Sequence, residues 1–147
     1  MTKFSKSDLK FFELARQEAV CSTYKNFHLG AVVVYKGRVV SSGRNSDKTH
    51  PEQKKYNDRY RHFKYGPQLI KDTLHAEMAA LLSVPYTVEE DMDWSKAKVY
   101  VYRISVGRKS GKGMARPCAG CFHALKDKGV RHLYYTTDDG YAYERLD

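Results

Sequence analysis

The chain has 147 residues and a formal net charge of +9, and 41% of its residues are hydrophobic and 13% aromatic. This length predicts one domain over residues 1–147, and the hydrophobic content excludes an intrinsically disordered chain. No run of about 18 apolar residues is present and the first residues lack the apolar core of a signal peptide, so we expect neither a membrane span nor secretion.

The first predicted element is an amphipathic helix over residues 7–23, with Ser7 as its N-cap. Its apolar residues recur at helical spacing and indicate a face that packs on the core: Leu9, Phe12, Ala15 and Ala19. A β-rich run over residues 30–35 follows, then a short turn and a second run over residues 38–42. This arrangement predicts an antiparallel hairpin. Asn45 comes just after it and, on local grounds alone, is a turn residue.

The stretch from residue 46 to residue 73 interleaves basic and aromatic side chains. They include Lys48, His50, Lys54, Lys55, Tyr56, Arg59, Tyr60, Arg61, His62, Phe63, Lys64 and Tyr65. Such a mixture can bind phosphates while its rings stack on bases. A solvated helix between residues 51 and 63, with its tyrosines on the sheet, explains the pattern equally well. The positive net charge favours an anionic partner but also fits ordinary surface solubility.

The remaining elements alternate between helix and strand. They are a helix after residue 75, a strand over residues 97–104, a helix over residues 118–129 and a strand over residues 130–136. The basic, glycine-rich residues 107–116 can clamp a substrate phosphate or form an exposed, mobile connection. Residues 141–147 are expected to pack on the sheet. This alternation predicts an α/β fold in which helices enclose one mixed sheet.

Two short motifs carry the candidate chemistry, His75-Ala76-Glu77 and Pro117-Cys118-Ala119-Gly120-Cys121. Cys118 and Cys121 lie one helical turn apart, and Pro117 suits the first position of that helix. One histidine and two cysteines supply three ligands to a tetrahedral zinc ion and leave one position open, as in catalytic zinc sites. Such an ion lowers the pKa of a bound water to about 7, and Glu77 beside it can take up and return the proton.

Each motif is weak evidence by itself, because C-x-x-C also occurs in redox proteins and in structural zinc sites. A structural site needs a fourth ligand, and neither Cys21 nor the other histidines lie at a regular spacing. A thioredoxin-like motif would follow the first strand, whereas this one comes late. The two motifs together, in this order, favour a catalytic zinc site. Cys21 would then be unpaired, which indicates a reducing, cytoplasmic location.

With these motifs the chain resembles the zinc-dependent cytidine and deoxycytidylate deaminase superfamily. The resemblance implies a three-layer α/β/α sandwich with one mixed sheet of about five strands. It implies that His75, Cys118 and Cys121 bind one Zn²⁺ ion and that Glu77 is the general acid and base. Members of the superfamily often form homo-oligomers in which neighbouring subunits complete the pocket, so the resemblance also allows for a homo-oligomer.

The resemblance further implies residues that bind the substrate. The backbone N–H of Ala76 would reach the base carbonyl, Asn45 would touch the sugar, and Pro117 would belong to the pocket. The implied reaction is hydrolysis of cytosine to uracil in a (deoxy)cytidine nucleotide or nucleoside, and the long link over residues 46–73 resembles deoxycytidylate deaminases. The alternatives are a deaminase of cytosine in single-stranded DNA or RNA, a tRNA adenosine deaminase, and a non-catalytic, zinc-stabilised nucleic-acid-binding module.

Overall fold

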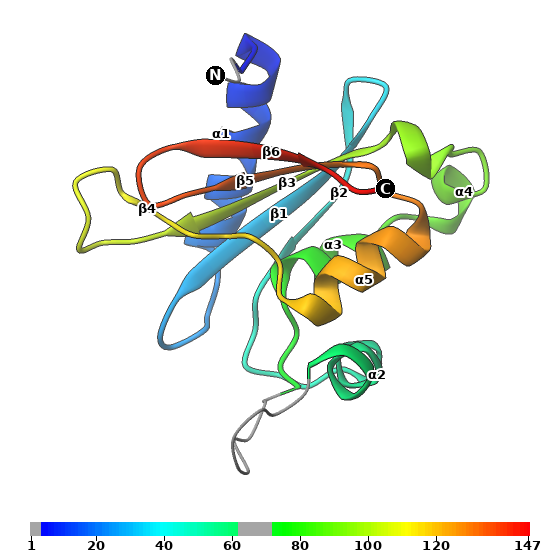
Figure 1. The fold of residues 1–147 in the computed structure, drawn as a ribbon, viewed down its shortest axis with the longest axis horizontal. Coiled ribbons are helices and arrows are strands. Elements are labelled where there is room, and N and C mark those ends of the chain that lie inside the picture. The colour runs from blue at the N-terminus through cyan, green and yellow to red at the C-terminus, as the bar shows by residue number, and fades with distance from the viewer. Residues whose placement is uncertain (1–3, 62–71) are drawn as a thin grey trace.

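The computed structural model describes residues 4–61 and 72–147 (Figure 1). The helices are α1 (Lys6–Val20), α2 (Pro51–Tyr60), α3 (Ala76–Leu82), α4 (Tyr86–Glu89) and α5 (Ala119–Lys128), with a 3₁₀ turn, η1, at Trp94–Lys96. The strands are β1 (His28–Tyr35), β2 (Arg38–Arg44), β3 (Lys98–Ile104), β4 (Lys112–Gly113), β5 (His132–Thr136) and β6 (Tyr141–Arg145). Within these ranges no helix combines the length and the apolar character that a membrane span requires.

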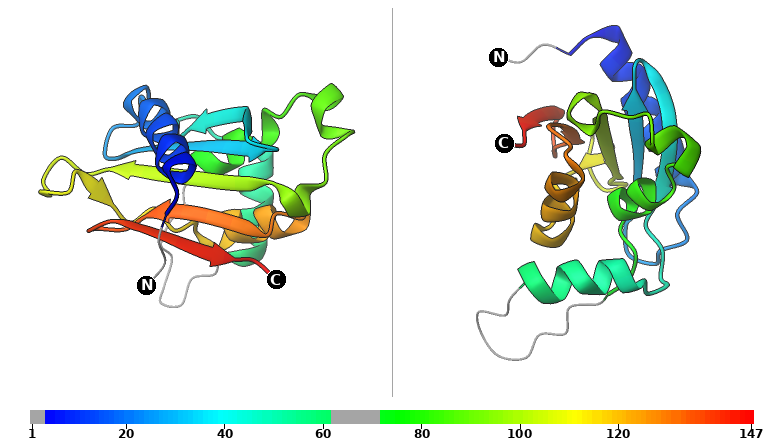
Figure 2. Two further views of the ribbon diagram at one scale, coloured as in Figure 1. Left: turned by 90° about the horizontal axis from the view of Figure 1, so that it is seen from above. Right: turned by 90° about the vertical axis from the view of Figure 1, so that its right-hand side faces the viewer.

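The strands form one mixed sheet in the order β2-β1-β3-β5-β6, and the short β4 pairs with β3. β3 and β5 run parallel, whereas the other paired strands run antiparallel. Helix α1 covers one face of the sheet, and α3 and α5 cover the other (Figures 1 and 2). These layers confirm the predicted α/β fold with one mixed sheet, and the C-terminal segment forms its edge strand.

Helix α1 begins earlier than predicted, because Ser5 and not Ser7 is its N-cap. The Ser5 hydroxyl accepts a hydrogen bond of 3.0 Å from the Asp8 backbone N–H, and the Asp8 carboxylate accepts one of 3.0 Å from the Ser5 N–H. This reciprocal pair is a capping box, which satisfies two backbone donors at once. It therefore fixes the start of the helix at Lys6, and the helix ends at Val20 rather than at residue 23.

Asp8 also ties α1 to the sheet, because the Tyr100 hydroxyl donates a hydrogen bond of 2.6 Å to its carboxylate. Burial raises the pKa of Asp8, but the hydrogen bonds from Tyr100 and Ser5 outweigh it and hold this pKa below 3.8. Folding therefore stabilises the ionised carboxylate, and this contribution is present above the unfolded-state pKa and is lost as the pH falls through the lower folded-state pKa.

We expect Tyr100→Phe to lower the free energy of unfolding by about 1.5–3 kcal/mol at pH 7, because it removes a hydrogen bond to a charged group. The deficit should shrink as the pH is lowered through the folded-state pKa of Asp8, which lies below 3.8. Urea denaturation of both proteins at pH 7 and under strongly acidic conditions measures the two differences. An equal deficit throughout would show that the ionised Asp8 is not the partner that matters.

Two glycines set how closely the helices approach the sheet. A Cβ atom on Gly30 in β1 would overlap the backbone of α1 at Ala15, and one on Gly43 in β2 would overlap the backbone of α3 at Ala80. Backbone atoms inside a helix cannot move aside singly, so an added methyl group would displace the whole helix. Gly43 thus determines where α3, which carries Glu77, lies against β2.

Gly43→Ala is expected to lower the free energy of unfolding by about 1–3 kcal/mol, the usual cost of overpacking a core. Gly107→Ala is the matched control, because a Cβ atom there would have no other atom within 4 Å. That exposed substitution should change stability by no more than about 0.5 kcal/mol. Urea denaturation compares the two variants, and equal stabilities would contradict the close packing of α3 on β2.

Helix α2 shows that part of the basic, aromatic stretch is helical, as one of the two interpretations held, and Tyr56 packs against the core cluster between the sheet and α5. Tyr56 donates a hydrogen bond of 2.8 Å to Asp127 in α5, and the Tyr60 ring stacks on His123 at 3.7 Å. Because α3 and α5 already cover this face of the sheet, α2 packs on α5 (Figure 1). The predictions for His62, Phe63, Lys64 and Tyr65 lie outside the described residues.

Candidate metal centre

Three side chains from the two motifs converge at one end of α3 and α5. His75 Nδ1 lies 3.5 Å from Cys118 Sγ and 3.3 Å from Cys121 Sγ, and the ligand atoms all lie within 4.8 Å of one another. Tetrahedral zinc, with bonds of about 2.3 Å to sulfur and about 2.0 Å to nitrogen, separates a bound sulfur and nitrogen by roughly 3.6 Å. The spacing and the soft donor set therefore both fit a zinc ion.

Both helices present these ligands at their N-termini. His75 is the N-cap of α3 and Cys118 is the N-cap of α5, where its sulfur accepts a hydrogen bond of 3.5 Å from the Cys121 N–H. The prediction that Pro117 occupies the first helical position is wrong. Because Cys118 takes the capping role, α5 begins at Ala119 and the buried Pro117 precedes the cap.

The two cysteines differ in acidity. The hydrogen bond with the Cys121 thiol, opposed by burial and aided by His75, lowers the pKa of Cys118 from 9.0 to about 3. The same contact with Cys118, together with burial, raises the pKa of Cys121. A divalent cation bound by both sulfurs requires both as thiolates, so its binding would release the remaining thiol proton.

Glu77 lies in the first turn of α3 and is only 3% exposed. Burial is the main cause that raises the pKa of Glu77 above 4.5, and Cys118 adds to this effect, whereas His75 opposes it. A carboxyl group with a raised pKa can exchange protons closer to neutral pH, which is what a general acid and base requires.

The metal-ligand cluster opens into a cavity of about 310 Å³, a volume within the usual range for small-molecule sites. Its lining consists of Phe27, Leu29, Asn45, Arg61, His75, Ala76, Glu77, Arg103, Met114, Ala115, Arg116 and Cys118. The structure thus brings Asn45, Ala76 and Glu77 together with two of the metal ligands. It does not place Pro117 in the lining.

Comparison with known proteins agrees with this arrangement of residues. A family model described as the cytidine and deoxycytidylate deaminase zinc-binding region matches residues 5–137. The chain belongs to this deaminase family. No curated protein sequence matches it significantly.

Several solved deaminase structures share the fold of this protein. A cytidine deaminase from Burkholderia pseudomallei has a TM-score of 0.58 at 17% identity, over 97% of this chain and 93% of that one. A dCMP deaminase from the cyanophage S-TIM5 has a TM-score of 0.56 at 18% identity, over 92% of this chain and 86% of that one. A cytidine deaminase from Mycobacterium leprae has a TM-score of 0.52 at 20% identity, over 95% of this chain and 94% of that one. These likenesses confirm the cytidine deaminase-like fold.

Asn45 lies in the cavity lining and joins three segments of the chain there. Its Oδ1 accepts hydrogen bonds of 3.0 Å from the Leu29 N–H and 2.5 Å from the Ser22 hydroxyl, and its Nδ2 donates one of 3.0 Å to the Phe27 carbonyl. The side chain is 4% exposed. These bonds use one of the two Nδ2 hydrogens, so the second can face a ligand in the cavity.

Three arginines give the cavity a positive rim, and Glu77 is the only carboxylate in the lining given above. Arg116 forms two hydrogen bonds of 2.9 Å with Glu144 of β6. The Arg103 guanidinium lies 5.1 Å from the Phe27 ring. The sequence analysis did not identify Arg103 as a site residue, because the local sequence pattern does not show that the end of β3 faces the cavity.

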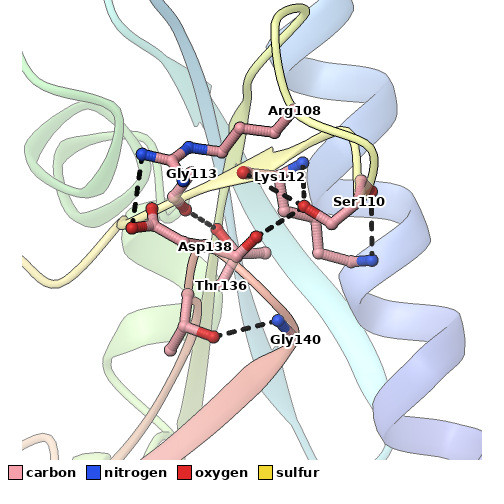
Figure 3. A network of polar contacts seen from close by, with 8 residues as sticks. Arg108, Ser110, Lys112, Gly113, Thr136, Asp138 and Gly140 are labelled. Atoms are coloured by element: carbon pink, nitrogen blue, oxygen red, sulfur yellow. Dashed lines mark hydrogen bonds and ion pairs between the residues drawn. The ribbon is translucent and has the colours of Figure 1, made fainter.

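The basic segment before Pro117 is fastened to the turn between β5 and β6, as Figure 3 shows. The Ser110 hydroxyl donates a hydrogen bond of 2.5 Å to the Asp138 carbonyl, and Arg108 forms an ion pair of 3.4 Å with the Asp138 carboxylate. The Thr136 hydroxyl donates one of 2.7 Å to the Gly113 carbonyl. Arg108 therefore points to this turn, and of the segment only residues 114–116 line the cavity.

Proposed function

We propose that the protein is a zinc-dependent hydrolase that deaminates cytosine to uracil in a cytidine nucleotide, with deoxycytidylate as the preferred substrate. One observation carries this proposal. A single cavity joins the three-ligand metal site, the buried carboxyl group of Glu77 and an arginine rim. A structural zinc site would need neither the carboxyl group nor the cavity.

The chain supplies the groups that such a reaction needs. Zinc, when held by His75, Cys118 and Cys121, supplies Lewis-acid chemistry that acidifies water. Glu77 takes a proton from the attacking water, passes it to the ring nitrogen of cytosine and supports protonation of the departing amino group. Water and cytosine thereby become uracil and ammonia. The Ala76 N–H, at the first position of α3, has no acceptor within the helix and can donate to the base carbonyl.

The rim favours a nucleotide over a nucleoside. Among the residues that the structure describes, Arg116 is paired with a carboxylate, whereas neither Arg61 nor Arg103 forms an ion pair. Two guanidinium groups that line the cavity and form no ion pair with the described residues suit the phosphate of a nucleotide. A cyanophage dCMP deaminase with a similar fold has been solved with dCMP and dUMP, which supports this substrate class.

Arg61→Ala and Arg103→Ala are each expected to raise KM for deoxycytidylate by about 10- to 100-fold, the equivalent of losing one charged hydrogen bond. KM for deoxycytidine, which has no phosphate, should change little. Ammonia release by zinc-loaded protein measures both. Arg38→Ala, outside the cavity lining, is the matched control. An equal rise in KM for both substrates would assign the arginines to the fold rather than to the phosphate.

A second candidate function is deamination within a polynucleotide. It is favoured by the net charge of +9 and by the exposed basic residues Lys55 and Arg59 on α2. Cytosine-containing single-stranded DNA and tRNA therefore belong in the same assay. Turnover of polymer alone, with a steep loss of binding as salt increases, would establish this candidate. Zinc binding without turnover of any substrate would overturn both candidate functions. The remaining hypothesis would then be a zinc-stabilised nucleic-acid-binding module.

A further inference from the structure

Helix α2 lies unusually close to the turn of α5 that carries the cysteines. A Cβ atom on Gly120 would lie 3.0 Å from Asn57 Oδ1 and 3.3 Å from the Tyr56 backbone carbon. A larger residue at position 120 would thus require α2 to shift by a few tenths of an ångström. The Tyr56–Asp127 hydrogen bond of 2.8 Å holds α2 in place farther along α5. Helix α2 is therefore one wall of the metal centre.

Gln53 is the side chain through which α2 reaches the ligands, and it is 0% exposed. Its Oε1 accepts a hydrogen bond of 3.1 Å from the backbone N–H of His75. Its Nε2 donates to Asn57 Oδ1 at 3.1 Å and lies 3.7 Å from Cys121 Sγ, within hydrogen-bond distance for sulfur.

This network fixes the orientation of the Gln53 amide. The His75 backbone N–H can only donate, so the amide oxygen must point to it, and the amide nitrogen is the end that donates to Asn57. The Cys121 sulfur lies 3.7 Å from both Oε1 and Nε2, so the thiol can donate to the oxygen and the amide N–H can donate to the sulfur. A thiolate has no proton to give, so the N–H of Gln53 donates to the sulfur when Cys121 is ionised. One buried side chain thereby contacts two of the three metal ligands.

We propose that Gln53 is a positioning residue of the metal centre. It holds the His75 backbone and the Cys121 sulfur at their ligand positions, and its N–H draws electron density from the thiolate. Groups that orient metal ligands in this way typically contribute about 10- to 100-fold to metal affinity. The inference rests on the proposed zinc-dependent function and assigns to helix α2, in the long link over residues 46–73, a role that its sequence does not reveal.

Two substitutions separate the contacts of Gln53. Gln53→Glu keeps an oxygen for the His75 N–H but has no N–H for Cys121, whereas Gln53→Leu removes both contacts at similar volume. Zinc dissociation constants from competition with a chromophoric chelator should rise about 10- to 100-fold in both variants. Gln17→Leu, on the exposed side of α1, should match the parent protein.

The cobalt-loaded proteins give a second readout that packing alone would not change. Without the hydrogen bond from Gln53, the Cys121 thiolate is easier to oxidise, so its sulfur-to-cobalt charge-transfer band should move to longer wavelength in Gln53→Glu and Gln53→Leu. Circular dichroism of the chelator-treated proteins shows whether each variant folds. If Gln53→Leu does not fold, Gln53→Glu and Gly120→Ala are compared instead. Gly120→Ala keeps the Gln53 side chain but shifts α2 slightly away from α5.

The outcomes separate this inference from the proposed function. Zinc affinity and a cobalt band that are unchanged in folded variants would overturn the inference and leave the deaminase proposal intact. Failure of the parent protein to bind zinc would overturn the proposed function itself. Weaker zinc binding together with a shifted band, in Gln53→Glu as well as Gln53→Leu, would establish Gln53 as a positioning residue.

Discussion

Replacement of Glu77 by glutamine is expected to lower kcat for cytosine deamination by about 10²- to 10⁴-fold, the usual contribution of a general acid and base. Glutamine has nearly the shape of glutamate but cannot carry a proton between water and the base. Because Glu77 is not one of the three side chains in the metal cluster, zinc content should remain that of the parent protein.

Steady-state ammonia release, zinc content and thermal unfolding of Glu77→Gln test this expectation together. Glu90→Gln is the matched control, since that carboxylate is exposed at the end of α4. Full activity of Glu77→Gln with normal zinc content would remove Glu77 from the mechanism.

The sequence was sufficient for the elements whose signal is local. The hairpin over β1 and β2 follows from two β-branched runs around a glycine turn, and α3 and α5 follow from apolar periodicity after His75 and Cys118. The start of α1 was misplaced because two serines precede the apolar stripe. Only the Asp8 side chain, which closes the capping box on Ser5, decides between them.

The candidate metal cluster was predictable for a different reason, because histidine and cysteine are typical zinc ligands and Cys118 and Cys121 have the spacing of one helical turn. The rest of the site depends on contacts between segments far apart in the chain. Gln53 is an ordinary polar residue of a basic helix until α2 packs on α5, and Arg103 is an ordinary strand residue until β3 ends at the cavity. Their partners are set by the packing of helices and strands, which local periodicity does not encode.

Removal of zinc is expected to lower the free energy of unfolding by about 4 kcal/mol, if free zinc beforehand exceeds its dissociation constant about 1,000-fold. The ion would join the N-cap of α3, His75, to the N-cap of α5, Cys118, so its loss unlinks two helices that cover the same sheet face. Cys121 is 1% exposed and would then lie buried without its metal bond. Urea denaturation with zinc and with chelator measures the difference.

Cys121→Ala shows whether this stabilisation passes through the proposed ligands. The variant should unfold at the same urea concentration with zinc and with chelator, because two remaining ligands hold the ion weakly. Cys21→Ala is the control, since Cys21 is exposed and outside the cluster, and its zinc-dependent gain in stability should equal that of the parent protein. A gain that survives in Cys121→Ala would place the stabilising ion elsewhere. A gain that disappears only in the cluster variant would show that His75, Cys118 and Cys121 bind the zinc ion that joins α3 to α5.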